Sequence, residues 1–189
     1  LDISNTNKVR EILEEIKPDI VINTAGINNV DYCEKYPNEA VKINVQAVKE
    51  ICHITKNIGI KFIQLSSDSV FDGIKQLPYE ETDVTKSINY YGKTKIESEK
   101  IVLENPDNVV VRASVLYGYL SHNLAKIESS SKKSINFGHW LINKLISNEK
   151  VKIITDEYSS PIIADDFARS ILHIIKHEKS GIFHSAPKL

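Results

Sequence analysis

The sequence predicts an α/β protein built on a doubly wound parallel sheet, which is a sheet covered by helices on both faces. Amphipathic helical segments alternate with short apolar runs along most of the 189 residues. Each connection between successive apolar runs is long enough to hold a helix, and strands joined by such crossovers lie parallel. Ligands of such sheets bind beyond the carboxyl ends of the strands, so we look for candidate site residues there.

The alternation of helices and strands continues along the whole chain. Apolar residues recur at helical spacing in each predicted helix, and Pro18 and Gly59 each end one such segment. Helices are predicted over residues 7–17, 38–57, 90–104, 137–146 and 165–177, and strands over residues 19–23, 60–65, 109–111, 151–154 and 182–184. Residues 119–134 have no periodicity, and we expect them to form a flexible loop over a substrate site.

Composition and charge exclude several classes of function. The 24 Lys and Arg residues are balanced by 25 Asp and Glu residues, so no basic surplus favours nucleic acid or a membrane surface. No apolar run approaches the ~20 residues of a spanning helix, and the first residues do not form a secretory signal, so we expect a cytoplasmic protein. Cys33 and Cys52 lack metal-ligand spacing, and the pair His173 and His177 has no evident third ligand. We therefore predict no metal site.

Two polar or small clusters follow the first two predicted strands. Thr24, Ala25 and Gly26 have small side chains that let a flat ligand or a phosphate approach the backbone, although an ordinary turn favours the same residues. The run Ser66-Ser67-Asp68-Ser69 follows the second strand. If the backbone stays extended there, Ser67 and Ser69 face the same side. A serine in this place holds a substrate carbonyl or simply caps the following turn.

A third candidate lies on the predicted helix over residues 90–104. Tyr91 and Lys95 are four residues apart, which places both on one face of that helix. An ammonium near a phenol favours the phenolate and lowers the pKa of the tyrosine. A tyrosine tuned in this way protonates an oxyanion as it forms.

Taken in order, these motifs resemble those of the extended short-chain dehydrogenase/reductases, and most closely the dTDP-4-dehydrorhamnose reductase branch. The segments that carry the resemblance are Asp2-Ile3, Asn23-Thr24-Ala25-Gly26, Ser66-Ser67-Asp68-Ser69-Val70-Phe71-Asp72-Gly73, Tyr91-Gly92-Lys93-Thr94-Lys95, Arg112-Ala113-Ser114 and Ser160-Pro161. The resemblance implies an NAD(P)-dependent reductase of a 4-keto deoxysugar nucleotide.

The resemblance also implies roles for three residues in catalysis. Ser67 would orient the sugar ketone, and Tyr91 would be the general acid that supplies the proton. Lys95 would lower the pKa of Tyr91 and bind the nicotinamide ribose. Asp68 would join Ser67 and Tyr91 in contacting the substrate.

The cofactor implied is NADPH or NADH, and the sequence does not distinguish the two. Asp2 and Ile3 match the loop beside the adenine, while Ala25, Gly26 and Ile27 match the strand end that runs along the cofactor. On this basis residues 1–114 form a partial dinucleotide-binding domain with the catalytic residues. Residues 115–189 form a substrate-binding region with the late strands. The expected partner is a nucleotide sugar, and a homodimer is compatible with the resemblance.

Three departures from the family pattern bear on substrate and cofactor. The glycine fingerprint of the first βαβ unit has no counterpart, so we expect a Rossmann-like sheet that lacks this unit. Ser69 stands where the family has an aromatic residue that faces the substrate. Val115 stands where the family has a tryptophan. Both changes weaken an assignment of the particular deoxysugar.

Other functions within the same superfamily stay open. The regulatory subunit of methionine adenosyltransferase resembles the same branch and binds a dinucleotide, yet it serves as a partner of another enzyme. The set of Ser67, Tyr91 and Lys95 is complete here and favours an enzyme. A nucleotide-sugar epimerase would share the tyrosine and lysine. A dehydratase would need a second acid where Ser69 follows Asp68.

Overall fold

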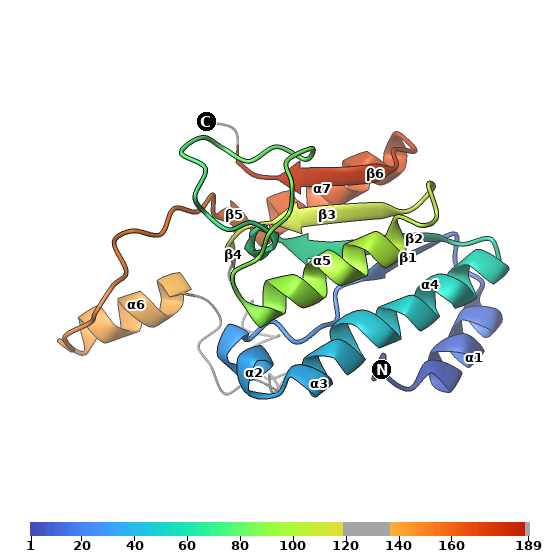
Figure 1. The fold of residues 1–189 in the computed structure, drawn as a ribbon, viewed down its shortest axis with the longest axis horizontal. Coiled ribbons are helices and arrows are strands. Elements are labelled where there is room, and N and C mark those ends of the chain that lie inside the picture. Colours follow the sequence, from blue (N-terminus) through green and yellow to red (C-terminus); the bar gives the residue numbers. More distant parts are fainter. Residues whose placement is uncertain (119–136, 188–189) are drawn as a thin grey trace.

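The computed structural model describes residues 1–118 and 137–187. In this part of the chain a four-stranded parallel sheet has the strand order β1-β2-β3-β6 (Figure 1). Its strands are β1 (Ile20–Asn23), β2 (Lys61–Ser67), β3 (Val109–Ala113) and β6 (Gly181–Ser185). The helices are α1 (Thr6–Ile16), α2 (Val30–Lys35), α3 (Pro37–Val41), α4 (Ala47–Asn57), α5 (Tyr90–Val102), α6 (Phe137–Ile146) and α7 (Ala164–Lys176). The predicted α/β class and parallel sheet are confirmed.

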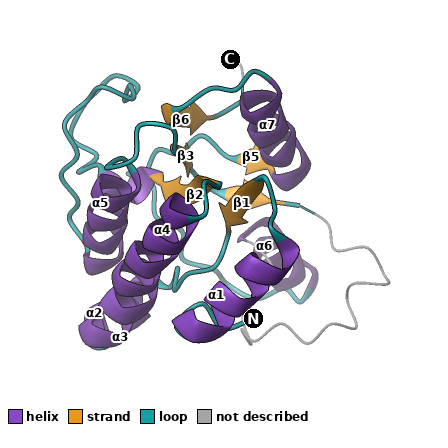
Figure 2. Cartoon of the chain, turned by 90° about the vertical axis from the view of Figure 1, so that its right-hand side faces the viewer, coloured by secondary structure: helices purple, strands orange, loops and turns teal. Residues whose placement is uncertain are grey.

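Helices cover both faces of the sheet because its central strands are apolar on both sides. Figure 2 shows α1, α4 and α5 on one face and α7 on the other. Successive side chains of a strand point to opposite faces. Accordingly Val110 packs in the core below α4 with Ile54, whereas Val109 and Val111 pack in the core below α7 with Ile174. The three valines of β3 are completely buried, as expected of a strand covered on both sides.

A buried ion pair ties α5 to the sheet. The carboxylate of Glu99 in α5 accepts two hydrogen bonds from Arg112 of β3. Arg112 Nε donates one at 3.0 Å and Nη2 donates the other at 2.7 Å. Ser66 of β2 donates to the same carboxylate at 2.5 Å. Both charged side chains are about 4% exposed, so each needs the other to offset the loss of water.

The long helix predicted over residues 38–57 is built from three segments. Between α3 and α4 the backbone is a π-helix, η1 (Lys42–Gln46), and the chain turns through all three without a break. Single π-helical turns inside α-helices are uncommon and often mark functional sites. Asn44 lies in this turn and is 3% exposed.

The structure corrects the predicted elements at three places. Residues 151–154 form no strand and Ile153 and Ile154 are exposed, since no strand within residues 1–118 and 137–187 pairs with this apolar run. Instead β4 (Leu116–Tyr117) pairs in parallel with β5 (Ile162–Ile163), and two-residue strands leave no periodic signal. Helix α2 was not predicted because six residues are too few to show helical spacing. The loop predicted over residues 119–134 lies outside the described residues.

Helix α6 agrees with the predicted segment at residues 137–146 and lies apart from the sheet in Figure 1. Phe137, Ile142, Leu145 and Ile146 of this helix are exposed. None of the helices within the described ranges is long and apolar enough to cross a membrane.

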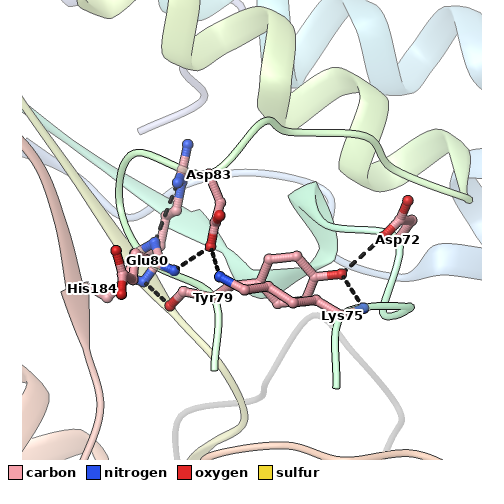
Figure 3. Close-up of polar contacts among 7 residues, drawn as sticks. Asp72, Lys75, Tyr79, Glu80, Asp83 and His184 are labelled. Carbon is pink, nitrogen blue, oxygen red and sulfur yellow. Dashed lines mark hydrogen bonds and ion pairs between the residues drawn. The ribbon is translucent and has the colours of Figure 1, made fainter. Parts of the chain in front are cut away.

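The segment between η2 (Asp68–Val70) and α5 folds back on the end of the sheet. Figure 3 shows Tyr79 between the carboxylate of Asp72, which accepts from the phenol at 2.8 Å, and the ring of His184 of β6. The rings of Phe71 and Tyr79 stack with centroids 4.2 Å apart. The guanidinium of Arg112 lies over the Phe71 ring. The segment is thus anchored to β3 and β6.

His184 is neutral in this arrangement. Arg112 only donates, so its contact with His184 Nε2 at 3.2 Å requires that nitrogen to accept. Nδ1 then carries the hydrogen and donates to the carbonyl oxygen of Tyr79 at 3.2 Å. Burial lowers the pKa of His184 below its ordinary value of 6.5, and the charge of Glu81 opposes this shift.

We expect His184 to make the fold less stable in weak acid. Its pKa is lower in the folded than in the unfolded state, so the unfolded chain binds the extra proton first and stability falls as the pH drops below 6.5. Urea denaturation at about pH 7 and about pH 5 measures this effect. Between these two pH values the free energy of unfolding should fall more for the wild type than for His184→Gln, whose side chain stays neutral throughout. Equal losses in both proteins would contradict the assignment.

Candidate active site

The structure brings Ser67, Tyr91 and Lys95 together at the carboxyl end of β2. Ser67 is the last residue of that strand, and Tyr91 and Lys95 lie on α5, which packs across it. The hydroxyl of Ser67 lies close enough to the phenol of Tyr91 to lower the pKa of that phenol. Lys95 Nζ donates to the carbonyl oxygen of Leu65 at 2.6 Å. Side chains from two elements therefore converge where the sequence predicted a site.

Gly92 allows this convergence. A methyl group built on Gly92 would lie 2.0 Å from the carbonyl oxygen of Ser69 and 2.1 Å from the Ser87 hydroxyl. No side chain fits there, so glycine lets the first turn of α5 approach the backbone that follows Ser67. Asn89 caps the helix by accepting from the Gly92 amide at 2.8 Å.

Burial controls the electrostatics of the tyrosine and lysine. It raises the pKa of Tyr91 to about 12, against a smaller lowering by the nearby Ser67 hydroxyl. It also lowers the pKa of Lys95 to about 8, although the charge of Glu99 opposes this. The sequence predicted that Lys95 lowers the pKa of Tyr91, and the opposite direction is found. The reason is that desolvation of the phenol is the largest cause of the shift.

The side chains of Ser67 and Ser69 are in contact, as predicted, but the backbone between them is not extended. Residues Asp68 to Val70 form a 3₁₀ turn, and Ser67 caps it by accepting from the Ser69 amide at 3.2 Å. The hydroxyls of the two serines are also 3.2 Å apart. The structure therefore confirms that Ser67 caps the following turn, and its contact with a substrate carbonyl stays a prediction.

Asn44 is a site residue that the sequence patterns did not single out. Its Nδ2 donates to the carbonyl oxygen of Ile27 at 2.9 Å and to the Thr94 hydroxyl at 3.0 Å. Thr94 in turn donates to the carbonyl oxygen of Tyr91 at 2.7 Å. Asn44 therefore couples the loop after β1 to the first turn of α5. A polar residue on the apolar face of a predicted helix was the signal that could have revealed it.

The two segments expected to bind cofactor both lie beside η1. Asn44 Oδ1 accepts from the Ile27 amide at 2.8 Å, and a methyl group on Gly26 would lie 3.1 Å from the same oxygen. Hydrogen bonds from Ser4 lower the pKa of Asp2, and the positive charge of Lys42 in η1 adds a smaller lowering. Ala25 and Gly26 are exposed at the carboxyl end of β1. Across the described residues no group of three or more potential metal ligands is found.

Comparison with known proteins decides the family. The family model described as "RmlD substrate binding domain" matches residues 1–188. The chain belongs to this family. The predicted branch of the extended short-chain dehydrogenase/reductases is thereby confirmed, since relatives of this RmlD-family chain include dTDP-4-dehydrorhamnose reductases along nearly its whole length.

Three relatives show the extent of the match. A probable low-salt glycan biosynthesis reductase of Haloferax volcanii is 33% identical over 98% of the chain, and the dTDP-4-dehydrorhamnose reductase of Salmonella typhimurium is 30% identical over 97%. The crystal structure of a dTDP-4-dehydrorhamnose reductase from Bacillus anthracis, in complex with NADP, superposes with a TM-score of 0.87 at 28% identity over the whole chain. The chain spans 60%, 59% and 63% of these proteins, respectively.

We expect Gly92→Ala to destabilise the RmlD-family chain even though alanine is the better helix former by about 1 kcal/mol. The added methyl group overlaps the backbone of Ser69, so α5 must shift, and the free energy of unfolding should fall by about 1–3 kcal/mol. Lys93→Ala, at an exposed position of the same helix, should change it by less than about 0.5 kcal/mol. Chemical denaturation that gives the same midpoint for both variants would refute the close approach.

We also expect Lys95 to make the stability of the fold change with pH in the alkaline range. Its folded pKa of about 8 lies below the ordinary 10.5, so between these values the unfolded chain holds more protons and stability rises with pH. Lys95→Met should lose this rise, whereas Lys93→Met should keep it. Thermal or urea denaturation across this range measures the difference. A Lys95→Met protein with the wild-type slope would show that Lys95 is not the titrating group.

Proposed function

We propose that the protein containing this chain is an NAD(P)-dependent reductase of a 4-keto deoxysugar nucleotide. The observation that carries the proposal is the convergence of Ser67, Tyr91 and Lys95 at the carboxyl end of β2 in a chain of the RmlD family. Two relatives named dTDP-4-dehydrorhamnose reductase support the substrate class.

The phenol of Tyr91 supplies the proton in this proposal. With a pKa of about 12 it stays protonated through the neutral range and has a proton to give as the ketone oxygen becomes negative. The Ser67 hydroxyl lies near enough to the phenol to lower its pKa, and in this proposal both groups address one carbonyl oxygen. Ser67 orients the ketone and stabilises the charge that develops on it.

The residues present fit a dinucleotide at the carboxyl ends of β1 and β2. Ala25 and Gly26 offer exposed backbone with almost no side chain, and Ile27 is held by Asn44. Asp2 and Ile3 are assigned to the adenine side, and Lys95 to the nicotinamide ribose. When bound, NADPH or NADH supplies the hydride that goes to the ketone carbon.

The division of labour along the chain is part of the proposal. Residues 1–114 would bind the cofactor and carry out the proton transfer, and residues 115–189 would contact the nucleotide sugar with Asp68. A glycine-rich phosphate-binding turn is not among the 189 residues, so contacts to the pyrophosphate are not assigned to this chain.

We expect Tyr91→Phe in the intact protein to lower kcat by ~10²-fold, because the general acid is lost while the ring that fills its place remains. Cofactor affinity should stay within about twofold of the wild type. Tyr90→Phe, one residue earlier in the same helix, is the matched control and should keep wild-type turnover.

The assay follows oxidation of NADPH and NADH with a dTDP-linked 4-keto-6-deoxy sugar, alongside cofactor titration. Unchanged turnover in Tyr91→Phe would overturn the assignment of the acid. A wild-type protein that binds the cofactor and turns over no 4-keto sugar would favour the regulatory-subunit function instead. Isomerisation of a sugar without net cofactor oxidation would favour an epimerase.

A further inference from the structure

Asp68 joins three separate parts of the chain at the edge of the candidate site. One carboxylate oxygen, Oδ1, accepts from the Ser67 hydroxyl at 3.0 Å. The other, Oδ2, accepts from the hydroxyl of Ser114, which directly follows β3, at 2.5 Å. The Ser114 oxygen accepts from the backbone amide of Ser160 at 3.2 Å. The end of β2, the end of β3 and the segment before β5 therefore share one chain of hydrogen bonds.

The directions of these hydrogen bonds follow from simple counting. The amide of Ser160 can only donate, so it uses a lone pair of the Ser114 oxygen. Ser114 then has one hydrogen left, and it points to Asp68. A carboxylate accepts through both oxygens and therefore binds the hydroxyl of Ser67 at the same time. Asp68, an exposed residue, therefore accepts from both serines.

The contact with Ser160 belongs to the small second sheet. The amide of Ile162 in β5 donates to the carbonyl oxygen of Val115 at 2.9 Å, next to the Ser160 contact, and β4 and β5 pair from there. Ser114 thus connects Asp68 to the part of the chain proposed to contact the substrate. We refer to Asp68, Ser114 and the Ser160 amide as the serine clasp.

The Ser67 oxygen is held from several sides. Besides its bond to Asp68, it accepts from the Ser69 amide at 3.2 Å and lies 3.2 Å from the Ser69 hydroxyl. Its hydrogen can rotate from Asp68 to a ketone oxygen while the Ser67 oxygen stays in place. Loss of the Asp68 contact would leave the serine free to adopt other rotamers, which lowers the fraction of productive geometry.

We propose that Asp68 is a positioning residue for Ser67, and that Ser114 acts on the reaction through Asp68 by tying β4 and β5 to the catalytic serine. This proposal rests on the proposed reductase function. It adds a positioning role to the substrate contact proposed for Asp68, since both carboxylate oxygens are engaged within the protein.

The first test is a double-substitution cycle in the intact protein with NADPH and a dTDP-linked 4-keto-6-deoxy sugar. We expect Asp68→Asn to lower kcat by ~10-fold and Ser114→Ala by ~3-fold, each with unchanged affinity for the cofactor. The protein with both substitutions should be no slower than Asp68→Asn alone, because Ser114 works through Asp68. Ser114→Thr, which keeps the hydroxyl, should restore wild-type kcat.

The second test does not depend on activity. Hydrogen exchange at the Ser160 amide should become ~10-fold faster in Ser114→Ala, because its acceptor is removed. Exchange at the Ile162 amide should stay at the wild-type rate, since that amide donates to a backbone oxygen that the substitution leaves in place.

The outcomes separate the two proposals. An intact wild-type protein that reduces no 4-keto sugar nucleotide overturns the proposed function. Active wild-type protein in which Asp68→Asn and Ser114→Ala lower kcat by independent, multiplying factors overturns the serine clasp alone. Unchanged exchange at Ser160 in Ser114→Ala also overturns the clasp, whatever the activity.

Discussion

The buried ion pair between Glu99 and Arg112 is the interaction on which the arrangement of the site depends. It joins α5 to β3, and its further partners are Ser66 of β2 and His184 of β6. A charge in the sheet interior is tolerated when it is paired and fully hydrogen-bonded, so the position of α5 is set within a narrow range. Tyr91 and Lys95 lie on that helix and are therefore presented to β2 in one orientation.

Two further residues, Gly92 and Asn44, help to fix the position of the first turn of α5. Gly92 removes the side chain that would keep the first turn of α5 away from Ser69. Asn44, on the π-helical turn, ties the same end of α5 to the loop after β1. The candidate catalytic residues and the segment proposed to bind the cofactor are thus joined by hydrogen bonds through Asn44. This is the arrangement that proximity and orientation effects in catalysis require.

Most of the sheet could be predicted because its strands are short apolar runs separated by long amphipathic helices. The strand predicted at residues 151–154 was wrong for a physical reason: an apolar run becomes a strand only where a neighbour offers hydrogen bonds, and Ile154 is exposed here. Periodicity also could not reveal the π-helical turn at Asn44, since one extra residue in a helical turn barely changes the pattern.

The sequence by itself determined the α/β class and the identity of Ser67, Tyr91 and Lys95 as a candidate set, because motif spacing survives in the linear chain. The tertiary structure decided the direction of the Tyr91 pKa shift, which burial raises to about 12 instead of an ammonium lowering it. It also decided the partners of Asp68 and Glu99, whose contacts at Ser114 and Arg112 lie 46 and 13 residues away along the chain. Desolvation and long-range hydrogen bonds depend on what surrounds a group in space, and a linear pattern does not contain that information.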